Sequence, residues 1–418
     1  MSLVITPFDA AAIMIVLAAA LGYINHRFIG LPTSIGLTIM GAVASLLVVA
    51  LDHLLSGPSV AEEIVKFIAG IDFHAALMDG MLSFLLFAGA LHVDWTEMRR
   101  GRWAILALST IGVLLSTVLV GAGLHLLAGW MGIAIPLIWC LVFGALISPT
   151  DPVAVMGVLR ETDVPPTLQA TVAGESLFND GVGVVIFAIL LAAAASGAPL
   201  SPPHALRMFV AEAGGGILLG LVIGWTAFRA MRSIDEYKTE VMISLAVVMG
   251  GYALASQLHV SGPVAMAVAG LIIGNHGVAH AMSDMTRDYL LKFWSLIDDI
   301  LNALLFLLIG LEVVTIPSDT RLILLGILTI PLIFAARCLS VLAPLGVMRT
   351  LLPLGRLAPI TLIWGGLRGG ISIALALGLP DGPERPYILA ATYIAVLFSV
   401  IVQGGTIGRA IKWREARS

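Results

Sequence analysis

Four polar side chains lie close together in a stretch of sequence that is otherwise apolar. They are Glu175, Ser176, Asn179 and Asp180, and a long apolar run follows them. Residues three and four apart share one face of a helix, so these side chains gather on one broad face. Carboxylate, amide and hydroxyl oxygens suit a small hard cation, and a carboxylate can take a proton instead. The pattern indicates a site at which a cation and a proton compete for Asp180. The simpler alternative is that these polar residues are structural and only fix the register of the helix against its neighbours.

A second motif interrupts the preceding apolar stretch. Ser148-Pro149-Thr150-Asp151-Pro152 brings two prolines and an acid into it. Proline removes a backbone donor and breaks a helix, which frees carbonyl groups such as that of Thr150 to face an ion. The break also exposes a positive helix N-terminus, whose charge Asp151 would offset. We interpret the motif as a broken helix at an ion site, with a plain proline kink as the alternative.

Two arginines occur in apolar surroundings later in the chain. Arg368 lies among four glycines in Gly365-Gly366-Leu367-Arg368-Gly369-Gly370, and Arg337 lies inside an apolar run. Arg368 could offset the carbonyl ends of a second broken helix. A buried acid such as Glu175 is held ionised by a guanidinium. We predict that Glu175 pairs with Arg337, with Arg368 as the alternative partner. Arg337 could also extend to the membrane interface.

The composition identifies an integral membrane protein. Hydrophobic residues make up 59% of the chain and charged residues 11%, and the mean hydropathy is +1.03. A soluble domain has a charged fraction of about 25%. Cys140 and Cys338 lie in apolar runs and indicate core positions rather than a disulfide framework. The sequence shows no nucleotide-binding loop, metal cluster or hydrolytic triad. It therefore predicts neither an enzyme, nor a cofactor, nor a nucleic-acid partner.

Apolar segments predict an all-α polytopic protein with about 13 transmembrane helices. Basic residues concentrate after the odd-numbered segments, which places the N-terminus outside and the C-terminus in the cytoplasm. The compact chain further suggests a bacterial inner membrane. The segments span roughly 8–27, 34–51, 76–94, 103–130, 133–159, 167–196, 206–229, 238–257, 261–275, 291–314, 320–347, 357–380 and 386–411.

The two interrupted segments suggest an internal repeat. The Ser148–Pro152 motif and the Gly365–Gly370 motif are about 220 residues apart, and matched breaks in two halves are a pointer to a transporter site. We expect two inverted six-helix repeats, with the interrupted helices near the bilayer midplane.

Four stretches together resemble the monovalent cation–proton antiporters of the NhaP type, which are related to eukaryotic sodium/proton exchangers. This resemblance implies a homodimer whose core domains move against a dimerisation domain. We expect a single transmembrane domain over 1–418 without a soluble regulatory domain, its core including roughly 76–196 and 291–411. The stretches are Ser148-Pro-Thr-Asp-Pro-Val-Ala-Val, Gly174-Glu-Ser-Leu-Phe-Asn-Asp-Gly, Trp364-Gly-Gly-Leu-Arg-Gly-Gly-Ile-Ser and Thr392-Tyr-Ile-Ala-Val-Leu-Phe-Ser-Val-Ile-Val-Gln-Gly-Gly-Thr.

The resemblance also implies roles for single residues of the site. Asp180 resembles the aspartate that binds cation and proton in this family. Asn179 resembles the asparagine typical of electroneutral members. Thr150 and Ser176 resemble cation ligands, and Asp151 resembles the acid that supports the asparagine.

Two further positions follow from the same resemblance. Glu175 and Arg337 resemble the buried ion pair of the family. Ala88 stands where some members carry an additional acid near the site. A third carboxylate from that helix is therefore not expected.

The sequence thus predicts a secondary antiporter that exchanges sodium for protons, with lithium and potassium as further candidate ions. A cation channel and an organic-anion symporter on a similar scaffold are the alternatives. The acids Asp151, Glu175 and Asp180 make an anion site unattractive.

Overall fold

The computed structural model describes residues 7–54, 73–159, 164–197, 201–277, 282–315, 319–347 and 354–415. Every regular element in these ranges is a helix, in agreement with the predicted all-α class. The helices are α1 (Pro7–Ile24), α2 (Thr33–Leu54), α4 (Phe73–Ala75), α5 (Leu82–Leu91), α6 (Trp95–Ala107), α7 (Val113–Trp130), α8 (Leu137–Ile147), α9 (Val153–Leu159), α10 (Pro166–Ser196), α11 (Pro202–Met231), α12 (Tyr237–Gln257), α13 (Gly262–Ile272), α15 (Asp284–Leu311), α16 (Thr320–Val347), α17 (Ala358–Trp364), α18 (Gly370–Leu377), α19 (Arg385–Phe398) and α20 (Gly404–Glu415).

Within the described ranges, eight helical stretches are long and apolar enough to cross a bilayer. One of them runs through α6 and α7, which a π-helical turn, Leu108–Gly112, joins into one rod. Shorter apolar helices cover Thr33–Leu47, Ala76–Leu91, Leu137–Ile147 and Gly262–Asn275. The chain is a multi-pass membrane protein, and the exact number of spans stays a prediction.

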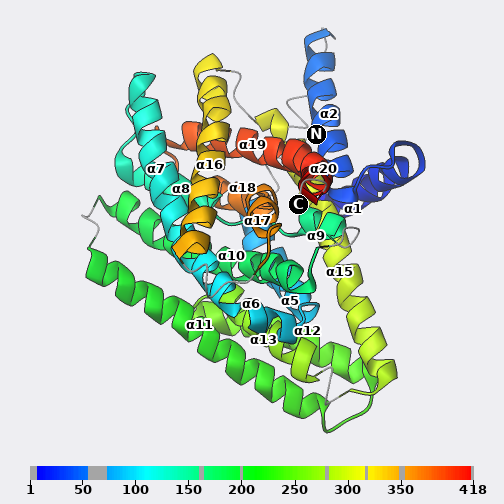
Figure 1. Cartoon of the computed structure of the whole chain (residues 1–418). Helices are drawn as coiled ribbons and strands as arrows, with labels where there is room; N and C mark the ends of the chain where they lie inside the picture. Colours follow the sequence, from blue (N-terminus) through cyan, green and yellow to red (C-terminus); the bar gives the residue numbers. More distant parts are fainter. Residues whose placement is uncertain are drawn as a thin grey trace.

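Packing divides the helices into two groups. In the first, α10 packs against α6 and α8, and α16 packs against α7 and α19. In the second, α13 packs against α5, α11 and α12, and α15 packs against α2. Figure 1 shows α11 and α13 on one side of α10, with α16 and α19 on the other. The division into the predicted core, 76–196 and 291–411, and a dimerisation domain stays a prediction.

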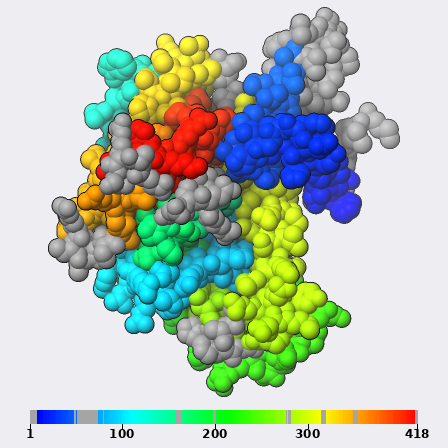
Figure 2. Space-filling view, turned by 45° about the vertical axis from the view of Figure 1, so that its right-hand side comes forward, coloured from blue at the N-terminus to red at the C-terminus, as the bar shows by residue number. Residues whose placement is uncertain are grey.

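The first helix lies on the outside of the second group. α1 contacts α2 and α15, and most of its apolar side chains are exposed. Figure 2 shows this helix in dark blue on the surface, beside α15 in yellow-green. A helix that is apolar all round and exposed has to face lipid or another apolar surface.

Two interrupted helices meet in the first group. The chain leaves helical geometry after Ile147 and resumes it at Val153, and it does so again between Trp364 and Gly370. The two breaks are joined directly, because the Asp151 amide donates a hydrogen bond of 2.8 Å to the Leu367 carbonyl. Both breaks occur at the positions that the prolines and glycines predicted.

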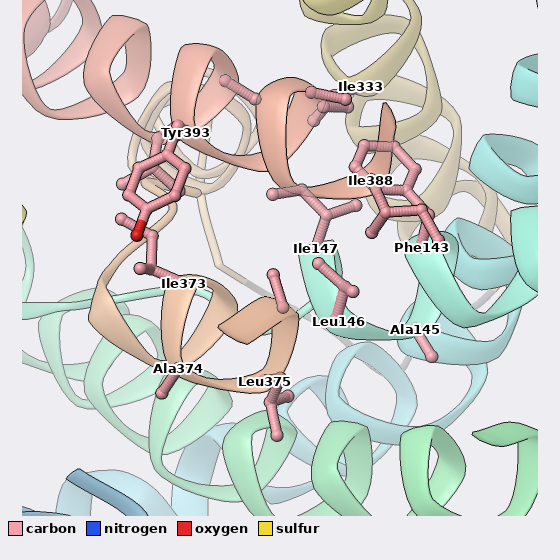
Figure 3. Close-up of a cluster of buried hydrophobic side chains, with 14 of the residues drawn as sticks. Phe143, Ala145, Leu146, Ile147, Ile333, Ile373, Ala374, Leu375, Ile388 and Tyr393 are labelled. Carbon is pink, nitrogen blue, oxygen red and sulfur yellow. The ribbon is translucent and has the colours of Figure 1, made fainter. Parts of the chain in front are cut away.

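An apolar cluster holds the interrupted helices in place. Figure 3 shows side chains of α8, α16, α18 and α19 gathered together. Phe143 and Ile147 of α8, Ile373 of α18 and Ile388 of α19 belong to this cluster and are almost fully buried. Dense burial of this kind fixes the two half-helices relative to each other. The polar backbone of the two breaks is thereby positioned beside α10.

Candidate functional site

Asp180 lies on the wall of the largest cavity described. The cavity has a volume of about 570 Å³, and the break residues Pro149, Thr150, Asp151 and Pro152 form part of the same wall. Asp180 itself is 6% exposed. Among the described residues, none donates a hydrogen bond to its carboxylate. The carboxylate is therefore available to an ion that enters the cavity.

The break and α10 are joined by a small hydrogen-bond network behind this wall. The Asn179 amide donates to the Thr150 hydroxyl oxygen at 2.7 Å, and the Asn179 carbonyl oxygen accepts from the Thr150 backbone N–H at 3.2 Å. The Thr150 and Ser176 hydroxyls lie 3.0 Å apart. These contacts fix the unwound segment against the helix that carries Asp180.

A buried ion pair lies on the same helix. The Arg337 guanidinium donates to both carboxylate oxygens of Glu175, at 2.7 and 2.9 Å, in a bidentate arrangement. Arg337 also donates to the Leu362 carbonyl, and the Asn179 amide donates to Glu175 at 3.1 Å. Glu175 therefore pairs with Arg337, and its oxygens are occupied by protein donors. Charge-assisted bidentate pairs are geometrically specific, so this pair fixes α16 against α10.

Arg368 has a different partner, the end of α8. Its guanidinium donates to the Ser148 carbonyl at 2.5 Å and to the Pro149 carbonyl at 3.1 Å. These carbonyls carry the partial negative charge of a helix C-terminus. The positive charge from one break therefore offsets the helix end of the other break. The prediction that Arg368 offsets carbonyl ends of the second interrupted helix was wrong in this respect, because its guanidinium contacts the end of the first.

Asp151 belongs to the opposite helix end. Its carboxylate accepts the Val153 N–H at 2.8 Å, which caps the start of α9. A side chain at Gly369 would place its Cβ only 2.6 Å from the Asp151 carboxylate. Similarly, a Cβ at Gly183 would lie 2.5 Å from the ring of Pro149. The two glycines thus permit the close approach of the second break and of α10 to the first break.

The structure separates the predicted site residues into two sets. Asp180, Thr150 and Asp151 line the cavity. Ser176 and Asn179 are almost fully buried, are not among the cavity-lining residues, and contact Thr150, which is. A further part of the cavity wall was not predicted from the sequence, namely Asp298, Asp299 and Asn302 of α15. The signal was present, because polar residues three and four apart interrupt the apolar segment 291–314.

Comparison with known proteins identifies the family. A sequence profile described as "Sodium/hydrogen exchanger, transmembrane" matches residues 15–413. The chain belongs to this family. It is similar to the Na(+)/H(+) antiporter NhaP of Pseudomonas aeruginosa, with 47% identity over 97% of this chain and 96% of the relative. It is also similar to the Na(+)/H(+) antiporter NhaH of Halobacillus dabanensis, with 33% identity over 91% of each chain.

A solved structure shows the same fold. The sodium proton antiporter MjNhaP1 from Methanocaldococcus jannaschii, at pH 8, superposes with a TM-score of 0.76 at 20% identity and covers 97% of both chains. The agreement extends over almost the full length of this sodium/hydrogen exchanger family member. The chain therefore shares the overall fold of that antiporter.

Proposed function

We propose that this protein exchanges sodium for protons across the membrane, and that both ions compete for Asp180. The observation that carries the proposal is the position of this carboxylate, which faces the cavity without a protein hydrogen-bond donor among the described residues. Family membership and the named activity of the relatives support the same function. Lithium and potassium remain candidate ions, since both also bind oxygen ligands.

The exchange would proceed through alternating occupancy of one carboxylate. Ionised Asp180 would bind sodium together with the Thr150 hydroxyl, with Ser176 and Asn179 orienting that hydroxyl. A proton would replace sodium on Asp180 for the return. Because the carboxylate holds one ion at a time, competition alone couples the two fluxes. Asn179 is uncharged, which supports an electroneutral exchange.

The remaining charged residues would hold the scaffold around Asp180. The Glu175–Arg337 pair would fix α10, and Asp151 and Arg368 would compensate the ends of the interrupted helices. No covalent bond is broken in this cycle, so the protein would act as a transporter and not as an enzyme. It would need no resident cofactor, because sodium and the proton are its cargo.

We further infer a bacterial inner-membrane protein with its N-terminus outside and its C-terminus in the cytoplasm. The basic residues Arg99, Arg100 and Arg102 support this orientation, because basic residues favour the cytoplasmic side and Arg100 pairs with Glu97 of the cavity lining. The cavity would then open to the cytoplasm. A homodimer is proposed from the family resemblance, with a core that moves against the dimerisation helices.

The proposal is tested in proteoliposomes with an acidic interior, where a pH-sensitive dye reports the gradient. Sodium, lithium and potassium are added in turn to the wild type and to Asp180→Asn. Sodium should collapse the gradient only with the wild type, and it should do so equally when the membrane potential is clamped at zero. Failure of all three ions with folded wild-type protein would overturn the proposal. Current without proton movement would favour a channel, and organic-acid uptake a symporter.

A further inference from the structure

α15 contributes one face to the cavity wall, beside α5, α10 and the two breaks. Ser295, Asp299, Asn302 and Leu305 line the cavity, and their spacing of three and four residues places them on one face of the helix. From the exposed Ser295 and Asp299 this face runs to the buried Asn302 and Leu305. The polar part of the wall therefore ends at Asn302.

Leu305 closes the inner end of this wall. Its side chain packs against Gly370 at the start of α18, so closely that a Cβ added to this glycine would collide with it. Leu305 is 4% exposed and belongs to the apolar cluster that surrounds the interrupted helices. Asn302 lies about one helical turn from this contact. It is thus the innermost polar residue that α15 contributes to the cavity.

The Asn302 side-chain amide has no hydrogen-bond partner among the residues that the structure describes. The residue is 7% exposed, and none of the described residues hydrogen-bonds to its side chain. A buried amide without a partner costs free energy, so natural proteins usually satisfy it with protein, water or a ligand. Its amide adjoins the cavity that also contains the Asp180 carboxylate. The side chain is therefore directed at the contents of that cavity.

The charges around the cavity favour a cation as that content. Asp94, Glu97, Asp298 and Asp299 are among the lining residues, and none of the described lining residues is a lysine or an arginine, although Glu97 pairs with Arg100 outside the lining. A cavity with acids at its mouth raises the local concentration of cations. A cation that moves inward passes the acids first and then meets Asn302.

We propose that the Asn302 amide oxygen is a further sodium-contacting group, which binds the ion beside Asp180 only while the cavity is open on this side. This inference rests on the proposed function. α15 packs on α2, α5 and α12, whereas α10 packs on α6 and α8. The boundary that matters here is the one between the two packing groups, which differs from the predicted core 76–196 and 291–411 in placing α15 with α2 and apart from α10. A movement of one packing group against the other would separate Asn302 from Asp180. Asn302 thus increases the apparent sodium affinity on the cavity side and leaves the opposite side unchanged.

The test compares the sodium KM from both sides of the membrane. Everted and right-side-out membrane vesicles present opposite faces of the protein to added sodium. Asn302→Ala should raise the KM on the cavity side by about three- to tenfold, the effect of one lost hydrogen-bonding ligand. The KM on the other side and the maximal rate should stay within about twofold of wild type. Ile300→Ala, on the exposed outer face of the same helix, is the matched control and should change neither KM.

Asn302→Asp keeps the shape of the side chain and adds a negative charge, so it serves as the second variant if Asn302→Ala does not reach the membrane. It should lower the cavity-side KM, because a carboxylate binds sodium more strongly than an amide. An unchanged KM in either folded variant, or an equal change on both sides, would overturn the role of Asn302. Absence of sodium-dependent exchange in the wild type would instead overturn the proposed function.

Discussion

Glu175 and Asp180 are two carboxylates on the same helix with opposite surroundings. Glu175 is 1% exposed and accepts hydrogen bonds from Arg337 and Asn179. Asp180 is 6% exposed, faces the cavity and has no donor among the described residues. The small difference in exposure does not explain the contrast. The partners do, because the oxygens of Glu175 are occupied while those of Asp180 are available.

The contrast shows how one helix can carry both support and transport. A buried charge is tolerated when a fixed opposite charge and hydrogen bonds compensate it. Glu175 has this compensation within the protein. Asp180 lacks it and can obtain it only from an ion or by accepting a proton. The same residue chemistry therefore stabilises the fold at one position and drives exchange five residues later.

The same substitution at both positions should separate these roles most strongly. Glu175→Gln leaves Arg337 without its ionic partner, so the folded state should lose about 3–5 kcal/mol. Asp180→Asn should remove exchange and leave stability near that of the wild type. Thermal unfolding in detergent, followed by size-exclusion chromatography, measures the stability of both variants. Equal stability of Glu175→Gln and Asp180→Asn would remove the distinction between the two carboxylates.

A double substitution sharpens the result for Glu175. Replacing Arg337 by Met together with Glu175→Gln removes both charges, so no uncompensated guanidinium remains. The double variant should recover part of the lost stability, because the penalty of the single variant arises mainly from the buried unpaired charge. Additive losses in the double variant would show that Glu175 acts through other contacts.

A smaller effect is expected at Arg368, which supports the break next to Asp180. Arg368→Gln removes the positively charged guanidinium, which donates hydrogen bonds to the Ser148 and Pro149 carbonyls. The loss should be about 1.5–3 kcal/mol, as for hydrogen bonds to a charged group. Thermal unfolding with Arg321→Gln as an exposed arginine control measures it. If Arg368→Gln matched the control, charge compensation at the break would be unnecessary.

The smallest effect should come from the contact between α10 and the first break. Gly183→Ala would press its new methyl group against Pro149, at a cost of about 1–3 kcal/mol from overpacking. Gly129→Ala is the matched control, since no described heavy atom apart from the backbone of its own helix and its chain neighbours lies within 4 Å of its new Cβ. Exchange activity and the temperature of thermal unfolding should decrease only in Gly183→Ala. Identical behaviour of the two variants would show that the break has room to move.

Much of this arrangement is predictable from the sequence, because helix interruptions are encoded by prolines and glycines at the interruption itself. Pro149, Pro152 and the glycines around Arg368 identify both interruptions, and the spacing of Glu175 and Asp180 places them on one helix. The partners of the two arginines are set by how α10, α16 and the two breaks pack together, which spacing along the chain does not encode. For the same reason the spacing could not show that the Ser176 hydroxyl contacts that of Thr150, and the role of Ser176 as a cation ligand stays a prediction.

The face of α15 that lines the cavity shows a different limit of prediction from sequence. Asp299 and Asn302 are visible as polar interruptions of an apolar helix, yet several faces of that helix could have been buried, exposed to lipid or turned to the site. Only the tertiary packing of α15 on α2 and α5 decides that this face lines the cavity. Similarly, no local feature of the sequence reveals which helices form each packing group.

The central claim is that sodium and the proton compete for one carboxylate, and the pH dependence of the sodium KM tests it most directly. Initial rates of sodium-dependent proton movement are measured in proteoliposomes over a series of pH values, with the same pH on both sides before sodium is added. Competition predicts that the KM rises as the pH falls, approaching about tenfold per pH unit, while saturating sodium restores the maximal rate. A KM that stays constant across the pH series, with only the maximal rate decreasing, would contradict a shared site at Asp180.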